Sequence, residues 1–301
     1  MMNRIIYNTI FSLLLLSGLL SLNSCSTIEA IEESDPKEMI LLIQHPGSKV
    51  RATETNFEAD DKIGVFVVEE EEGLSAPLQL SGNHTNNAVL TFNGSAWQPA
   101  KPIYWTDVKV DVYGYYPFMD IISVDAQPYS VKLDQSIAST AENLSGYEAS
   151  DFLWAKSEAV ESSIGAVPLR FHHRMSKAVI KLYKGLDYEG ELPENAELFI
   201  HNTVPNAHID FATGAVIKDP YGKPATIKCR KLSSDTFEAV VVPQYIETRR
   251  PMIEIVAGDI SYLLEDNFIF KSGMKHTFKL TINASPEQIK IEIDPSTGEW
   301  D

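Results

Sequence analysis

Cysteine is scarce in this sequence, since only Cys25 and Cys229 occur among its 301 residues. A framework of several disulfides, of the kind that holds small secreted domains together, is therefore excluded. Cys229 lies in the segment TIKCRK, a pattern that is typical of a strand. We expect a buried and inert thiol there rather than a nucleophile.

Positive charge is also in short supply. The chain has 25 Lys and Arg against 42 Asp and Glu, which gives a net charge of −17 at pH 7. Because so acidic a protein repels polyanions, no nucleic-acid partner is expected. Acidic residues are frequent directly after Cys25, at Glu29, Glu32, Glu33 and Asp35. We interpret residues 25–38 as a solvated acidic tether.

Catalytic and metal-binding motifs are missing. The chain has no H-E-x-x-H, G-x-S-x-G, Walker, dinucleotide-binding or C-x-x-C pattern. His172 and His173 are adjacent, and neighbours on a strand point to opposite faces, so the two are not expected to share a metal. His201 and His208 are isolated, and nothing marks out two of the many carboxylates as a glycosidase pair. We predict a protein that is not an enzyme and needs no cofactor or metal, with a secreted hydrolase as a minor alternative.

The N-terminal apolar run is too short for a membrane-spanning helix. Residues 5–20 number 16, whereas a span needs about 20. The run follows Arg4 and ends in LNSC, residues 22–25, which predicts a lipoprotein signal peptide over 1–24. A small residue before a thiol is typical of a bacterial lipoprotein site, so we predict lipid attachment at Cys25. The alternative is a secretory signal in which this cysteine is incidental.

Helical periodicity is scarce from Met39 onward. Short apolar or alternating runs recur between turns of Pro, Gly, Asn and Asp. The strand predictions are 39–44, 62–69, 108–116, 178–183, 237–243, 260–265, 276–283 and 288–293. Only residues 134–165, rich in small polar side chains, are weakly patterned, and a long loop or a short helix is expected there. The pattern predicts an all-β protein built from β-sandwiches.

Two domains are expected, because roughly 260 residues of short strands exceed one simple sandwich core. We place the boundary near Val167. The predicted N-terminal sandwich domain covers residues 39–166 and the C-terminal one residues 167–301.

Aromatic residues are frequent between residues 95 and 118. They are Trp97, Tyr104, Trp105, Tyr113, Tyr115 and Tyr116. Exposed aromatic faces suit glycan binding, which makes a surface carbohydrate-binding lipoprotein the alternative function. We favour the interpretation that these rings belong to a β-sandwich core and its strand edges.

Arginine is missing between Arg4 and Arg170 except at Arg51. The segment HPGS precedes it and ATET follows it, so the bond between Arg51 and Ala52 is expected in an exposed loop that a protease can reach. The alternative is an ordinary loop arginine that is not cut.

Four segments taken in order carry a family resemblance. They are RATETNFEADDKIGVFVV (51–68), NGSAWQPAKPIYWTDVKVDVYGYYPF (93–118), LRFHHRMSKAVIKL (169–182) and FKSGMKHTFKLTINASPEQIKIEIDPSTGEW (270–300). Behind a lipoprotein signal, they resemble the fimbrillin family of Bacteroidales (Mfa-like, type V pilin), over nearly the whole mature chain. One departure is Ala59, since the family often has a glycine before its Asp.

The resemblance implies two tandem transthyretin-like β-sandwich domains and a route of assembly for a fimbrial subunit or accessory protein that serves cell adhesion. The precursor would be lipidated at Cys25 and carried to the outer membrane surface, and an Arg-specific protease would cut after Arg51. Loss of the first strand would open a groove that a segment of another subunit fills. The implied partners are other fimbrial subunits, the outer membrane, the protease and a host or bacterial surface receptor.

Elementary energetics agree with such an exchange. The displaced-strand candidates are Ile40, Leu41, Leu42 and Ile43. Their run is apolar enough for a central or groove-filling strand, so its loss would leave backbone groups unpaired beside apolar surface. A replacement strand would then bind strongly by β-augmentation.

The donor-strand candidates lie near the C-terminus. Ile289, Ile291 and Ile293 share one face of an alternating run, with Trp300 as a terminal plug. The alternative is an internal edge or core strand. Only eight residues follow Ile293, so no long free arm is available, and the roles of stalk, anchor, tip and accessory subunit all stay open.

Overall fold

The computed structural model describes residues 37–46, 56–140, 143–247, 249–258, 260–283, 290–293 and 298–300. Contacts divide the chain into Met1–Pro36 and a compact unit, Lys37–Asp301, and the account below concerns the second. In its described part, the elements are strands together with two short 3-10 helices, η1 (Glu148–Ser150) and η2 (Ser162–Ile164). The predicted all-β fold is confirmed. Within the described residues, no helix has the length and apolar character that a membrane span requires.

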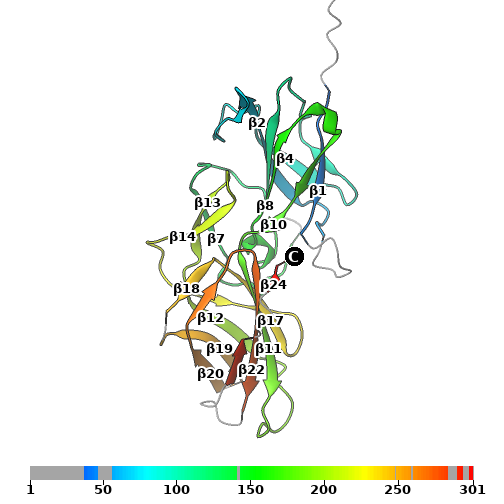
Figure 1. The fold of residues 1–301 in the computed structure, drawn as a ribbon. Helices are drawn as coiled ribbons and strands as arrows, with labels where there is room; N and C mark the ends of the chain where they lie inside the picture. The colour runs from blue at the N-terminus through cyan, green and yellow to red at the C-terminus, as the bar shows by residue number, and fades with distance from the viewer. Residues whose placement is uncertain are drawn as a thin grey trace, which may run out of the picture. The chain divides into compact units, whose positions relative to one another are not determined.

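A seven-stranded antiparallel sheet lies in the upper part of Figure 1. Its order is β10 (His172–His173), β8 (Leu153–Val160), β6 (Val110–Tyr116), β2 (Lys62–Glu71), β4 (Thr85–Phe92) and β5 (Trp97–Pro99), with β3 (Leu74–Ser75) on β2. Strand β2 is buried on both faces, because Ile63 and Val65 enter one core and Phe66 and Val68 enter another. Burial on both faces explains why its sequence is a continuous apolar run rather than an alternating one.

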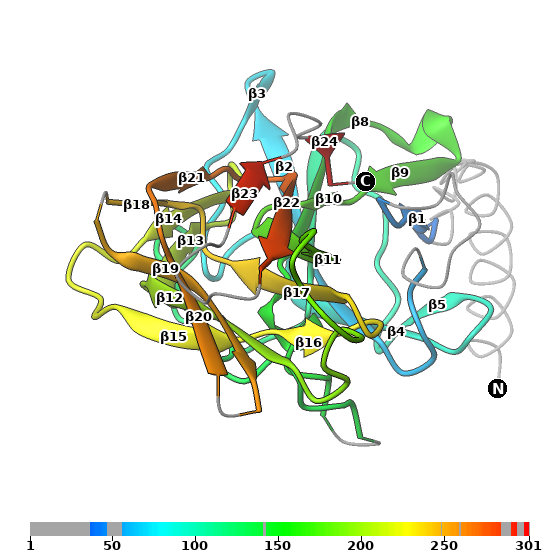
Figure 2. The same cartoon turned by 90° about the horizontal axis from the view of Figure 1, so that it is seen from below.

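A parallel pair covers one face of this sheet. Strand β1 (Ile40–Gln44) lies beside β9 (Ala166–Arg170). The core between them and the sheet contains Ile63 and Val65 of β2 together with Val167 and Leu169 of β9. In Figure 2 the labels β1, β4, β5 and β9 lie together on one side of the molecule.

Most of the remaining strands form a second pair of sheets. One has the order β16 (Arg230–Lys231), β17 (Thr236–Val241), β11 (Ser176–Lys184), β22 (Met274–Ile282) and β23 (Lys290–Ile293), with β24 (Gly298–Glu299) also on β22. The other has the order β15 (Ala225–Lys228), β12 (Glu197–Thr203), β19 (Pro251–Ala257) and β20 (Ile260–Glu265). Strand β22 alternates as a half-buried strand should, with His276, Phe278 and Leu280 in the core.

Two small sheets complete the fold. They are β14 (Ala215–Lys218), β13 (Asn206–Asp210) and β7 (Gln127–Ser130), and the pair β18 (Gln244–Ile246) and β21 (Phe268–Phe270). The ring of Phe211, just after β13, packs 4.7 Å from that of Tyr115 on β6. Through such contacts, one apolar cluster runs from the seven-stranded sheet into the C-terminal sheets.

The predicted domain boundary stays a prediction. Strand β9 begins at Ala166 and β10 follows it, and these two strands pair with β1 and β8, which lie earlier in the chain. Residues 134–165, expected as a loop or short helix, contain η1 but also the eight-residue strand β8. The expectation missed β8 because its sequence LWAKSEAV carries charged residues on the half-exposed side.

Candidate functional site at the end of strand β1

Strand β1 is held mainly along one edge. Its register with β9 runs from Ile40 opposite Ala166 to Gln44 opposite Arg170, and the Phe171 N–H donates to the Gln44 carbonyl at 2.9 Å. Only the start of the segment is held on the other side, where the Met39 N–H donates to the Ile103 carbonyl at 2.7 Å. Among the described strands β9 is the only partner of β1, so of the two positions expected for this run, central or groove-filling, the described strands do not give the central one.

The backbone of β9 is suited to a parallel partner. Because successive N–H groups of a strand point to opposite sides, the N–H groups of Val167 and Leu169 face the same way as that of Phe171, toward β1. Pro168, which lacks an N–H, therefore falls on the side away from β1 and costs the ladder nothing.

The four displaced-strand candidates alternate between two faces. Leu41 and Ile43 pack against the core, behind the buried Met39. Ile40 and Leu42 point outward and are 63% and 51% exposed. The strand thus adds its inward side chains to the core that contains the fully buried Val167, Leu169 and Phe171.

An aromatic cluster closes the end of β1. The His45 ring lies 4.9 Å from that of Phe57, edge to face. Phe57 also meets the rings of Trp97 at 4.9 Å and Phe171 at 5.8 Å. Phe57 is therefore the point at which the chain rejoins the core after β1. The predicted cut between Arg51 and Ala52 falls between these two anchors and lies outside the described residues, as does Cys25.

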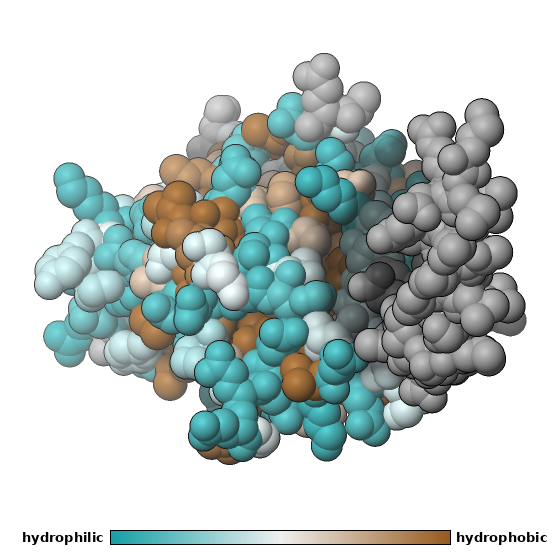
Figure 3. Space-filling view, turned by 90° about the horizontal axis from the view of Figure 1, so that it is seen from above, coloured by the Kyte–Doolittle hydropathy of each residue, from teal (hydrophilic) through white to brown (hydrophobic). Residues whose placement is uncertain are grey.

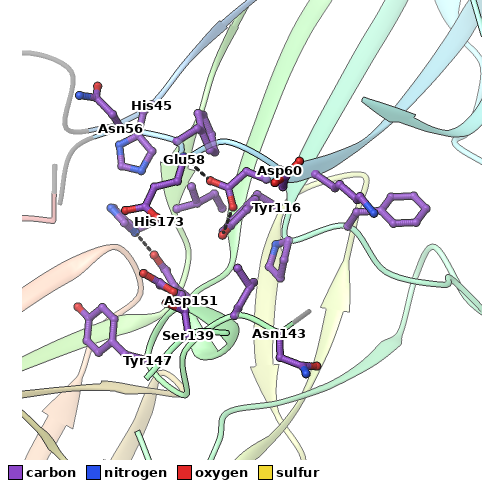
Figure 4. Close-up of a pocket in the computed structure, with 18 of the residues that line it drawn as sticks. His45, Asn56, Glu58, Asp60, Tyr116, Ser139, Asn143, Tyr147, Asp151 and His173 are labelled. Carbon is purple, nitrogen blue, oxygen red and sulfur yellow. Dashed lines mark hydrogen bonds and ion pairs between the residues drawn. The ribbon is translucent and has the colours of Figure 1, made fainter. Parts of the chain in front are cut away.

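A cavity of about 880 Å³ lies beside this cluster (Figure 4). Polar side chains lining it include His45, Glu58, Asp61, Tyr116, Asp151 and His173. One Asp61 oxygen accepts the Tyr116 hydroxyl at 3.0 Å and the other accepts the Glu58 N–H at 2.7 Å. Burial raises the pKa of Asp61, and burial followed by the nearby His173 lowers the pKa of His45 to about 4. Neutral His45 is the form that this site favours.

The C-terminal Trp300 reaches the same site. Its ring stacks on that of His173, with centroids 3.8 Å apart and planes 3° from parallel. His173 Nδ1 lies 2.8 Å from Asp151 Oδ2, and the ring of His45 lies 6.1 Å from that of His173 (Figure 4). The roles of His45, Phe57 and Asp151 were not predicted from the sequence, because each depends on residues far away in the chain.

The donor-strand candidates are paired within the chain. Strand β23 lies antiparallel to β22, with Ile291 opposite Leu280 and Ile293 opposite Phe278. Ile289 lies outside the described residues. Among the described strands β23 is the last of its sheet on this side, the position of an edge strand within the chain.

The histidines and the cysteine that were considered from the sequence take part in the packing and hydrogen bonding of the fold. His172 is exposed and His173 is buried, as their adjacency on a strand predicted, and the described residues contain no group of three potential metal ligands. His201 lies between Thr226 and Glu254, with hydrogen bonds of 2.9 and 2.8 Å. Cys229 is confirmed as buried, and burial raises the pKa of its thiol.

The aromatic residues between 95 and 118 do not form an exposed platform. Trp105, Tyr113, Tyr115 and Tyr116 are buried, and Trp97 packs against Phe57. Of these six residues only Tyr104 is exposed, at 40%. The interpretation as core is confirmed for the buried rings, so a carbohydrate-binding face made of them loses its support. Figure 3 shows hydrophobic residues mixed with hydrophilic ones on one face of the molecule.

Comparisons with known proteins place this fold. The model of a family described as fimbrillin-like matches residues 50–300. A candidate cell adhesion protein from Bacteroides ovatus has a similar structure, with a TM-score of 0.64 and 16% identity over 88% of this chain and 98% of the other. One from Bacteroides uniformis has a TM-score of 0.60 and 17% identity over 85% of this chain and 97% of the other.

The tip fimbrial protein Mfa3 of Porphyromonas gingivalis, truncated at its C-terminus, is similar as well. Its TM-score is 0.50, with 8% identity over 88% of this chain and 99% of the other. At these identities the likeness concerns the fold alone. No curated protein matches the chain.

Proposed function

The chain belongs to the fimbrillin-like family, and from this premise we propose that it is a structural or accessory subunit of a fimbrium, joined to its neighbours at the cell surface by exchange of strand β1. The precursor is lipidated at Cys25, anchored in the outer membrane and cut after Arg51 by an Arg-specific protease. The fragment that leaves then carries both the lipid and β1.

The observation that carries this proposal is the way in which β1 is bound in the fold. The strand is bound along one edge by β9, and its inward side chains cover a continuous core. Without it, the N–H of Phe171 loses its acceptor, and Val167 and Leu169 meet water. Each lost backbone hydrogen bond costs about 0.5–1.5 kcal/mol, and each fully exposed large apolar side chain costs about 1.5–3 kcal/mol.

These costs give an incoming strand its affinity. A strand that supplies carbonyls to the N–H groups of β9 and two inward apolar side chains restores what β1 provided. The segment with Ile289, Ile291 and Ile293 remains our donor candidate. It has to leave its place beside β22 in order to act, and a head-to-tail exchange of this kind does not close, so it produces a filament.

Processing and assembly can be tested together on the surface form of the protein. We expect N-terminal sequencing to find a chain that begins at Ala52, and electrophoresis in SDS to show a ladder of resistant oligomers. The substitution Arg51→Ala should remove both results, whereas Lys49→Ala, in the same segment, should preserve them. Oligomers that persist in Arg51→Ala would contradict strand exchange after cleavage.

A further inference from the structure

We propose that Trp300 is a latch that couples strand β1 to the C-terminal segment 298–300, with His173 as the contact that they share. The coupling is a property of the single chain. Only its use in assembly rests on the proposed function.

The residues that surround Trp300 are far from it in sequence. The ring is 8% exposed and stacks on His173, while Lys177 Nζ lies 5.6 Å from the ring centroid. The Trp300 N–H donates to the Gly273 carbonyl at 2.9 Å. Gly273 in turn lies against the backbone of His173, since a Cβ at this position would be 3.1 Å from the His173 carbonyl oxygen. Trp300 therefore connects the C-terminal segment 298–300 to His173 of strand β10.

His173 is held from two further sides. Asp151 Oδ2 lies 2.8 Å from its Nδ1 atom. The His45 ring approaches it edge to face, with centroids 6.1 Å apart. His45 directly follows β1 and comes from the segment that a cut at Arg51 would detach. Without this ring, His173 and Asp151 are hydrated on that side, and the surface on which Trp300 stacks is less firmly fixed.

The coupling runs in both directions. If occupancy of the β1 seat strengthens the stack of Trp300, then the stack strengthens the seating of β1 by the same factor. Departure of β1 would loosen the C-terminal segment 298–300, which contains β24. Strand β24 pairs with β22, and so does the donor candidate β23. One cleavage would thus open the groove and loosen the possible donor in the same subunit, while the uncut precursor keeps both ends closed.

Amide hydrogen exchange on the uncut chain tests the coupling without any need for cleavage or polymerisation. The probes are the Trp300 N–H at the C-terminal end and the Phe171 N–H, which donates to β1. In His45→Ala we expect the Trp300 amide to exchange faster by about two- to tenfold, the range that one ring contact supports. In Trp300→Ala the Phe171 amide should exchange faster by a similar factor.

The matched control is Leu42→Ala, which removes an outward side chain from the same strand. It should leave the Trp300 amide at the wild-type rate. An amide of the central strand β6 reports global unfolding in every variant. The proposal is overturned if Trp300 exchange is unchanged in His45→Ala, if Phe171 exchange is unchanged in Trp300→Ala, or if Leu42→Ala accelerates Trp300 as much as His45→Ala does. Failure of fimbrial assembly would leave these exchange rates unaffected, so the two proposals fail separately.

Discussion

The buried His276 should make the stability of this fold fall between pH 7 and pH 5. Its side chain is 2% exposed and faces Phe268, with ring centroids 5.0 Å apart. The Lys271 N–H donates to its Nε2 atom at 3.1 Å, so Nε2 carries no proton and the ring is neutral. Protonation would set two donors against each other in an apolar site. Burial, followed by the charge of Lys271, lowers the pKa of His276 from 6.5 to about 4.

The magnitude follows from proton linkage. The unfolded chain binds a proton at His276 below about pH 6.5, whereas in the folded protein His276 becomes protonated only below about pH 4. A lowered histidine pKa therefore gives full stability above the unfolded value and a loss as the pH falls. From pH 7 to pH 5 the free energy of unfolding drops by about 2 kcal/mol. For a unit of this size the loss corresponds to a fall in Tm of roughly 4–8 °C.

Calorimetry of the wild type and His276→Gln at the two pH values isolates this contribution. The lowered pKa of His45 acts in the same direction and the raised pKa of Asp61 acts in the opposite one, but both are common to the two proteins. The glutamine can still accept from the Lys271 N–H and does not titrate, so its Tm should fall by about 4–8 °C less than that of the wild type. His172→Gln alters an exposed side chain and should behave as the wild type does. Equal falls in the wild type and His276→Gln would refute the reasoning.

Two further substitutions test the cores. In Gly64→Ala the new Cβ would lie 2.2 Å from the ring of the buried Tyr115, so overpacking should cost about 1–3 kcal/mol by chemical denaturation. Gly298→Ala, which meets nothing within 4 Å, is its control, and equal stability of the two variants would contradict the packing argument. In Glu238→Gln the buried Lys177 ammonium loses a carboxylate 2.7 Å away, and we expect a loss of about 3–5 kcal/mol. A loss below about 1 kcal/mol would show that other groups neutralise Lys177.

The strand predictions succeeded where the signal is local. Residues 62–69, 178–183, 260–265 and 276–283 were expected as strands, and β2, β11, β20 and β22 occupy them with small differences at the ends. Side chains alternate along β22 because one face of its sheet is buried, and such a pattern can be read without knowledge of the partners.

The candidate site was only partly predictable, because it is made by long-range contacts. The sequence indicated the apolar run at Ile40 and the lone Arg51. It gave no sign that His45, Asp151 and Trp300 would all lie around His173, since these residues come from four separate segments. No local period records which histidine stacks on which tryptophan.

The outward face of β1 bears on the strand exchange that we propose. Permanent edge strands usually carry charged or polar side chains on their open side, since an apolar edge invites unwanted pairing. Here Ile40 and Leu42 are more than half exposed and add little to the closed fold, while the inward Leu41 and Ile43 cover the core. In the proposed exchange, removal of the strand would also remove these exposed apolar side chains, while the core beneath Leu41 and Ile43 would still need a replacement strand to cover it. A strand apolar on both faces but bonded along one edge therefore suits the role that we propose, in which β1 protects the groove during export and is then replaced.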